Sequence, residues 1–143
     1  MYAGCTLVFV LGTGLMLHRL LDGARSYARF NTMFFPAFIA YAVVWSIAWF
    51  KLGFGRGEWI GSAAGCAAFV AVLAAFLRGW RGLLSAWLML FLCHSAGYFI
   101  GGVLYYPSDH GVVPKLLWGL LYGLGFGAGI GFAFWQLQRA NKH

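Results

Sequence analysis

Charged residues are scarce in this chain. Only 9% of its 143 residues are Asp, Glu, Lys or Arg, whereas 62% are hydrophobic. Soluble domains carry about 25% charged residues, and a water-soluble fold of this length could not bury so much apolar surface. The composition therefore excludes a soluble globular protein. It predicts an all-α, polytopic integral membrane protein, because helices satisfy their own backbone hydrogen bonds in lipid.

Acidic residues are the scarcest charged group. There are three, and Asp22, Glu58 and Asp109 each fall in or beside an expected connection between apolar segments. The sequence has no paired carboxylates, no Ser-His-Asp set, no H-E-x-x-H and no Walker motif. We therefore predict no catalytic residues, and an enzyme is the least favoured class. Proton-coupled transport through an intramembrane carboxylate is not supported either.

Cysteine is also rare, and its pattern indicates no metal site. Cys5, Cys66 and Cys93 all lie in apolar segments, and none belongs to a C-x-x-C pair. Buried cysteine commonly acts as a small hydrophobic residue, and zinc requires about four ligands. We expect no metal and no resident cofactor. The net charge of +7 falls between the apolar segments without a continuous basic face, so it favours lipid headgroups over nucleic acid as partners.

Long apolar segments dominate what remains. Crossing about 30 Å of hydrocarbon takes ~20 residues, and the chain has room for five such spans in a single transmembrane domain, residues 1–143. The first connection is expected at 22–32, with Pro36 in the first turn of the second span, where a missing N–H costs least. The expected spans are about 3–21, 33–52, 59–77, 83–106 and 116–137.

The basic residues predict the orientation of these spans. With the N-terminus outside, seven of the ten Lys and Arg residues fall on the cytoplasmic side, as the positive-inside rule requires. The sequence thus favours an N-out, C-in protein of the cell (inner or plasma) membrane. Five arginines are expected to contact lipid headgroups on the cytoplasmic side: Arg19, Arg25, Arg29, Arg78 and Arg81.

Glycines recur at regular spacing in the last apolar segment. Gly119, Gly123, Gly127 and Gly131 follow each other every four residues, and Gly125 and Gly129 lie between them. Each glycine costs roughly 1 kcal/mol of helix propensity in water, but in a membrane it allows neighbouring helices to approach closely. This pattern predicts a glycine zipper that packs within the chain, contacts another copy, or acts as a flexible gating helix.

The fourth apolar segment carries the strongest candidate for a polar site. Three residues fall along one helical stripe: Trp87, His94 and Tyr98. At 1.5 Å per residue His94 lies near the membrane midplane, and an intramembrane ionisable residue is a functional candidate. Gly97 and Gly101 on the same face admit a neighbouring helix.

Several functions fit that stripe. His94 can bond a carbonyl or serine across a helix contact, line a solute, ion or proton path, or ligate a cofactor such as haem. A loop pair, Asp109 and His110, offers acid-base chemistry or a solvated turn. The favoured function is binding or passing a small solute or ion, as an oligomer. The alternatives are a non-catalytic anchor or assembly subunit of a larger membrane complex and a membrane enzyme that acts on lipid.

Overall fold

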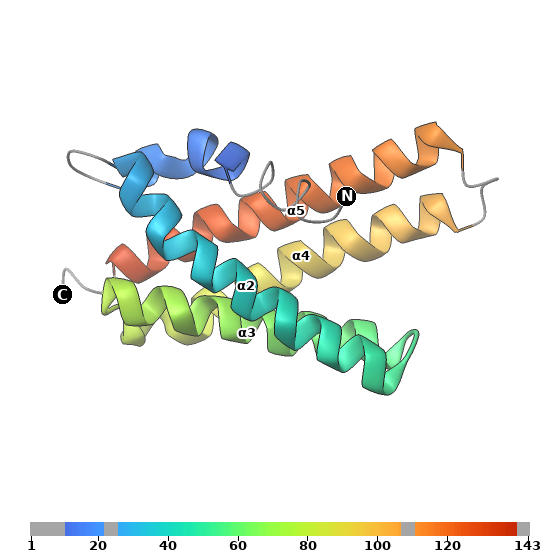
Figure 1. The fold of residues 1–143 in the computed structure, drawn as a ribbon, viewed down its shortest axis with the longest axis horizontal. Helices are drawn as coiled ribbons and strands as arrows, with labels where there is room; N and C mark the ends of the chain where they lie inside the picture. Colours follow the sequence, from blue (N-terminus) through green and yellow to red (C-terminus); the bar gives the residue numbers. More distant parts are fainter. Residues whose placement is uncertain (1–10, 22–25, 107–110, 140–143) are drawn as a thin grey trace.

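Helices make up nearly all of the computed structural model over the residues it describes, which are 11–21, 26–106 and 111–139 (Figure 1). Four helices are long and apolar enough to cross a membrane, which is compatible with a helical membrane bundle. Residues 11–17 are also helical, but most of the remaining first expected span lies outside the described residues. The elements are η1 (His18–Leu20), α2 (Ser26–Leu52), α3 (Arg56–Leu77), η2 (Trp80–Gly82), α4 (Leu83–Tyr105) and α5 (Val112–Arg139).

The start of α2 corrects the sequence-based expectation. The connection expected at 22–32 and the placement of Pro36 in a first turn are wrong, because α2 begins at Ser26 and Pro36 lies well inside it. Polar side chains in this first part bond back to their own helix. Asn31 Nδ2 donates to the Tyr27 carbonyl over 3.0 Å, and Thr32 Oγ1 donates to the Ala28 carbonyl over 2.9 Å. A polar stretch of sequence is therefore helical here.

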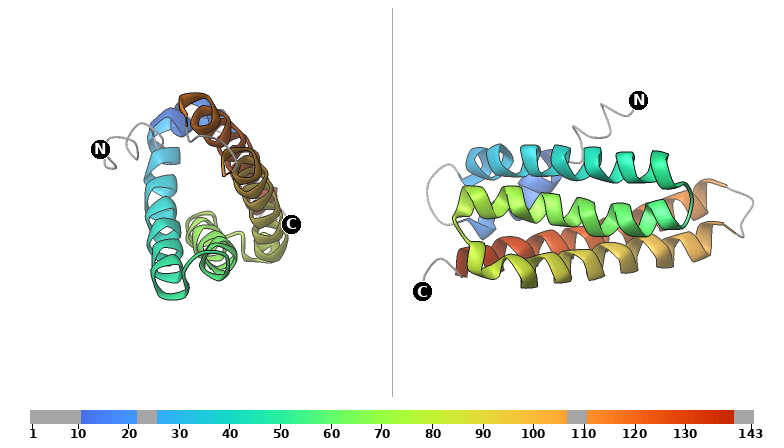
Figure 2. Two further views of the ribbon diagram at one scale, coloured as in Figure 1. Left: turned by 90° about the vertical axis from the view of Figure 1, so that its right-hand side faces the viewer. Right: turned by 90° about the horizontal axis from the view of Figure 1, so that it is seen from below.

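The long helices form two antiparallel hairpins. Figures 1 and 2 show α2 beside α3 and α4 beside α5, with the two pairs diverging along their length. Residues 53–55 join α2 to α3, and the short segment 78–82 joins the hairpins. The first turn is tight because Gly53 and Gly55 adopt φ angles of 72° and 79°, which glycine alone adopts without strain.

Close backbone approach holds α2 against α3. A Cβ at Gly57 would lie 2.9 Å from Trp49 Cα, and one at Gly65 would lie 2.9 Å from the Tyr41 ring. Gly61 lies between them and faces Trp45. Since real Cβ atoms do not come so near, these glycines set the distance between the helices. The hairpin is closely packed over the first half of α3.

The second hairpin is packed in the same way. A Cβ at Gly97 would lie 2.5 Å from the Leu121 carbonyl oxygen, and one at Gly129 would lie 2.8 Å from Leu90. Gly125 faces the Cys93 carbonyl and Gly97. In contrast, a Cβ at Gly119, Gly123 or Gly127 would meet no described atom within 4 Å. One side of α5 therefore packs on α4, and the side with Gly119, Gly123 and Gly127, called here the open side, has no described neighbour at these glycines.

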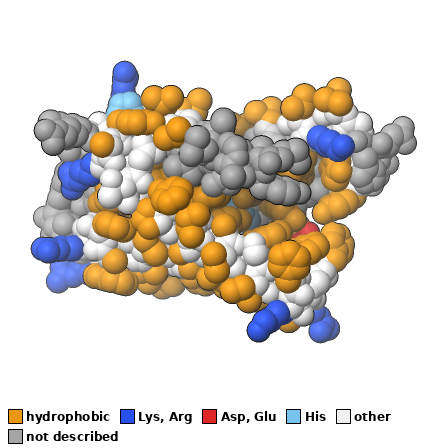
Figure 3. Space-filling view, viewed as in Figure 1, with side chains coloured by type: hydrophobic (Ala, Val, Ile, Leu, Met, Phe, Trp, Pro, Cys, Tyr) orange, Lys and Arg blue, Asp and Glu red, His pale blue; other side chains and the backbone are white. Residues whose placement is uncertain are grey.

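The two ends of the bundle differ in charge. Up-and-down hairpins bring Arg19, Arg29, Arg78, Arg81 and Arg139 to one end, called here the arginine end. The opposite end, called the cleft end, carries Lys51, Arg56 and Lys115. Blue side chains in Figure 3 lie at both ends, and many hydrophobic side chains lie on the described surface between them. This division is typical of a protein that crosses a membrane.

Phenylalanines fill the space between the hairpins toward the arginine end. Phe30 stacks on Phe134 with ring centroids 4.7 Å apart, and Phe34 meets Phe69 edge-on at 5.7 Å. Offset and edge-on pairs of this kind are the favourable aromatic geometries. The rings are completely buried, so the hairpins meet here without a gap. The phenylalanine core consists of Phe30, Phe34, Phe69, Phe126 and Phe134.

Candidate functional site

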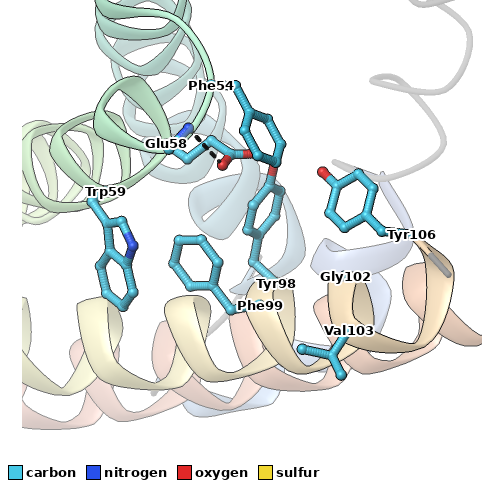
Figure 4. Close-up of a pocket in the computed structure, with 9 residues that line it drawn as sticks. Phe54, Glu58, Trp59, Tyr98, Phe99, Gly102, Val103 and Tyr106 are labelled. Atoms are coloured by element: carbon cyan, nitrogen blue, oxygen red, sulfur yellow. Dashed lines mark hydrogen bonds between the residues drawn. The ribbon is translucent and has the colours of Figure 1, made fainter.

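A cleft of about 520 Å³ separates the hairpins at the cleft end. One wall comes from the α2–α3 turn and the first residues of α3, and the other comes from the last turns of α4. Nearly all of the lining is apolar or aromatic, as Figure 4 shows. The lining residues are Phe54, Gly55, Glu58, Trp59, Tyr98, Phe99, Gly102, Val103 and Tyr106.

Glu58 supplies the carboxylate of this cleft. It is the third residue of α3 and only 4% of its surface is exposed. One oxygen accepts the Gly55 backbone N–H over 3.1 Å, which caps the helix start, where a negative charge is favourable. The other oxygen accepts the Tyr98 hydroxyl over 2.8 Å. Both donors are neutral, so neither cancels the charge of the carboxylate.

The burial of Glu58 corrects a second expectation. The sequence placed this residue in a turn and predicted no acidic residue within a span, but α3 starts at Arg56 and includes it. Its contact with Tyr98 crosses from one hairpin to the other. A buried carboxylate therefore lies in the first turn of α3, where the sequence predicted none. The available signal was its position three residues after a glycine at a helix start.

Aromatic rings line both walls of the cleft. Trp59 of α3 stacks on Phe99 of α4 with centroids 4.1 Å apart, and Phe54 meets Tyr106 edge-on at 5.7 Å. Trp59 is 52% exposed and Phe54 is 71% exposed, so part of each ring is accessible at the mouth. Burial, and then the nearby Glu58 charge, raises the pKa of the Tyr106 hydroxyl above its usual value. That hydroxyl therefore stays protonated at neutral pH.

A second polar cluster lies deeper between the hairpins. His94 is completely buried, and its Nε2 lies 2.6 Å from the Tyr41 hydroxyl of α2. The Tyr41 hydroxyl also lies 3.2 Å from the Tyr122 hydroxyl of α5. Three helices thus meet through one buried set of hydrogen bonds. The partner of His94 is a tyrosine hydroxyl and not the carbonyl or serine that a simple helix contact would supply.

Tyr98 connects the cleft with this inner cluster. Its ring lies parallel to the His94 imidazole at 6.1 Å, one helical turn along α4, and its hydroxyl reaches Glu58. His94 Nδ1 is buried and has no hydrogen-bond partner among the described residues. A buried polar atom without a partner is costly, so the nitrogen is available to a polar guest that reaches it. Beyond His94 the phenylalanine core begins, since Phe126 packs edge-on against the imidazole at 5.1 Å.

The other residues predicted from sequence are distributed as follows. Trp87 donates its Nε1–H to the Ala63 carbonyl over 2.9 Å and fastens α4 to α3, away from the cleft. Gly97 and Gly101 face α5, and Gly131 approaches Leu20 at 3.9 Å. The arginines at 19, 29, 78 and 81 are exposed at the arginine end. Arg25, Asp109 and His110 lie outside the described residues.

Metal-ligating side chains do not gather in the described ranges. Cys66 and Cys93 are free thiols, and no three His, Cys, Asp or Glu side chains come together within 11–21, 26–106 and 111–139. Comparison with known proteins found no family model, no curated protein and no solved structure that matches this chain. The chemistry of the cleft and the inner cluster therefore carries the functional argument.

Proposed function

We propose that this chain is a small multi-pass membrane protein that binds a small solute in the cleft and passes it along the bundle. The observation that carries the proposal is the cleft itself, a space of about 520 Å³ with the buried Glu58 carboxylate in its wall. Ligand sites are typically concave, mostly apolar and equipped with a few convergent polar groups. Buried ionisable groups within a membrane domain also mark solute and ion pathways.

The inner cluster supports passage beyond the cleft. Glu58, Tyr98 and His94 lie in succession from the mouth toward the phenylalanine core, and His94 Nδ1 is free to bond a guest. The core closes the arginine end, so the arrangement is open on one side and closed on the other. Passage then requires the phenylalanine rings to separate. Such alternation between two openings is the general principle of solute transport.

The orientation of the cleft follows from charge. Five of the eight Lys and Arg residues that the structure describes lie at the arginine end and three at the cleft end. By the positive-inside rule the arginine end is cytoplasmic and the cleft opens outward. We also infer that the first apolar segment, residues 3–21, crosses the membrane as a fifth span and places the N-terminus outside. Reporter fusions that put both termini on one side would contradict this topology.

Cysteine protection tests whether the cleft binds solutes. Cys5, Cys66 and Cys93 are first replaced by alanine, and Val103→Cys or Val112→Cys is added to that background. Val103 lines the cleft and Val112 does not, yet they are 71% and 72% exposed at the same end. The rate of reaction with a water-soluble maleimide is then measured with benzyltrimethylammonium, benzyl alcohol or benzenesulfonate present.

Binding in the cleft predicts that at least one of these three solutes slows labelling at position 103 and leaves position 112 unaffected. If none of the three solutes slows labelling at position 103, the proposal is refuted. Passage is tested in liposomes that contain the purified protein, where uptake of the protecting solute should depend on His94. Uptake that is unchanged in His94→Ala would remove the inner cluster from the path.

A second function is favoured by the open side of α5. Gly119, Gly123 and Gly127 meet no described atom, and small residues on a membrane helix allow another helix to approach closely. This observation favours an assembly role, either as a homo-oligomer or as a non-catalytic subunit of a larger membrane complex. Mass measurement of the protein in mild detergent separates the two, because a homo-oligomer gives an integral multiple of 15.7 kDa after detergent and lipid are subtracted.

A further inference from the structure

The cleft combines a buried negative charge with exposed aromatic faces. Glu58 is 4% exposed, and among the described residues its two hydrogen-bond donors are neutral groups, the Gly55 N–H and the Tyr98 hydroxyl. A carboxylate removed from water without a counter-charge is expensive. A cation held beside it would therefore be strongly favoured, and an anion would be repelled.

Five aromatic residues surround the space beside that carboxylate: Phe54, Trp59, Tyr98, Phe99 and Tyr106. They come from both hairpins, and Figure 4 shows Trp59 stacked on Phe99 while Phe54, Tyr98 and Tyr106 lie beside Glu58. The faces of such rings attract cations, most strongly when water is excluded, and groups of them recognise quaternary ammonium ions. Two independent features of the same cleft thus select the same sign of charge.

The shortage of oxygen ligands decides which kind of cation fits. Apart from Glu58, the side chains that offer oxygen to the cleft are the hydroxyls of Tyr98 and Tyr106. Calcium takes six to eight oxygen ligands and magnesium keeps a tight octahedral shell, so the apolar walls suit neither ion. An organic cation is weakly hydrated, and its carbon atoms can contact the rings while its charge faces Glu58.

We propose that the cleft binds organic monocations with an apolar or aromatic body, with Glu58 as the counter-charge and Phe54, the most exposed ring of the lining, as the main aromatic contact. This inference rests on the proposed function, since it names the ligand class of the same cleft. Glu58 and the rings act by direct contact with the cation. Neutral solutes of the same size gain only the apolar contacts and bind more weakly.

The labelling assay at position 103 tests separately whether the cleft binds solutes and whether it prefers organic cations. Benzyltrimethylammonium should protect this position at a concentration about tenfold lower than benzyl alcohol requires, and benzenesulfonate should not protect it. If benzyl alcohol or benzenesulfonate protects as well as the cation, the cation class is wrong and the cleft remains a binding site. If no solute protects, the proposed function fails together with this inference.

Two variants test the named residues in that assay. Glu58→Gln keeps the shape of the side chain and removes its charge, so the cation should need about tenfold more concentration and benzyl alcohol should be unaffected. Phe54→Leu keeps an apolar side chain without a π face, and protection by the cation should weaken several-fold. Unfolding of each variant by a denaturing detergent, compared with that of the parent protein, checks that the fold is intact. Unchanged protection by the cation in both variants would overturn the proposal.

Discussion

The two ends of the bundle use the same residue type in opposite ways. At the arginine end the rings of Phe30, Phe34 and Phe134 are completely buried. At the cleft end Phe54 and Trp59 are more than half exposed beside a cleft of about 520 Å³. Composition does not explain this difference, because both ends are rich in aromatic residues. The difference arises from how the hairpins are joined.

A short covalent connection brings the hairpins together at one end only. Residues 78–82 link α3 to α4 at the arginine end, and Gly79 lies so close to α5 that a Cβ would contact the Leu137 backbone. At the cleft end the α2–α3 turn and the α4–α5 loop belong to separate hairpins. Glycine contacts fix each hairpin internally, so the spacing between hairpins can differ from one end to the other. Burial of aromatic rings thus follows topology and not sequence composition.

Truncation of a core ring should have the largest effect on stability. Phe34→Ala removes a completely buried ring that contacts Phe69, and the expected loss is about 3 kcal/mol. Trp59→Ala removes a half-exposed ring at the cleft, and the loss should be about 1 kcal/mol or less. Both losses of stability are measured by adding a denaturing detergent to the protein in a mild detergent and following its unfolding. Equal losses would show that the ends are packed alike.

A methyl group added to a glycine should have the next largest effect, and only on one side of α5. Gly97→Ala places a Cβ against the Leu121 carbonyl, and overpacking of this kind costs about 2 kcal/mol. Gly123→Ala meets no described atom, so the change in stability should stay within about 0.5 kcal/mol. If Gly123→Ala is as harmful as Gly97→Ala, the open side of α5 is covered in the assembled protein.

Loss of a hydroxyl in the inner cluster should have the smallest effect. Tyr41→Phe removes the 2.6 Å contact with His94 Nε2, and hydrogen bonds between membrane helices are worth about 1 kcal/mol. Tyr122→Phe removes only the longer 3.2 Å contact with Tyr41 and should cost less. The same unfolding assay ranks the two. A larger loss for Tyr122→Phe would show that the cluster is centred on α5.

Much of the helical architecture could be predicted from local sequence. The segment 83–106 is uncharged and begins after Gly82, and α4 begins at Leu83 and ends one residue early at Tyr105. The end of α3 at Leu77 also follows from sequence, because Arg78 and Gly79 come next. The start of α2 could not be predicted in this way. Its polar residues bond back to the helix, and hydropathy alone does not reveal those hydrogen bonds.

The site itself depends on contacts that no local pattern contains. Glu58 and Tyr98 are 40 positions apart, and Tyr41 and His94 are 53 positions apart. Periodicity could group His94 with Tyr98 on one face of a helix, since both lie on α4. It could not identify Tyr41 or Tyr122, because a tyrosine in an apolar helix looks like any other large residue. Which helix faces which is decided by packing between hairpins.

The short connection between the hairpins at residues 78–82 has a mechanical consequence. Arg78 caps α3 with a φ angle of 54°, a left-handed conformation that turns the chain sharply. Beyond it, glycine contacts hold α4 against α5. At the cleft end the described parts of the hairpins are joined by side chains alone, through the Tyr98–Glu58 hydrogen bond and the Trp59–Phe99 stack, so separation at that end leaves the connection at 78–82 intact. A molecule bound in the cleft would act as a wedge, and its size would set the angle between the two hairpins.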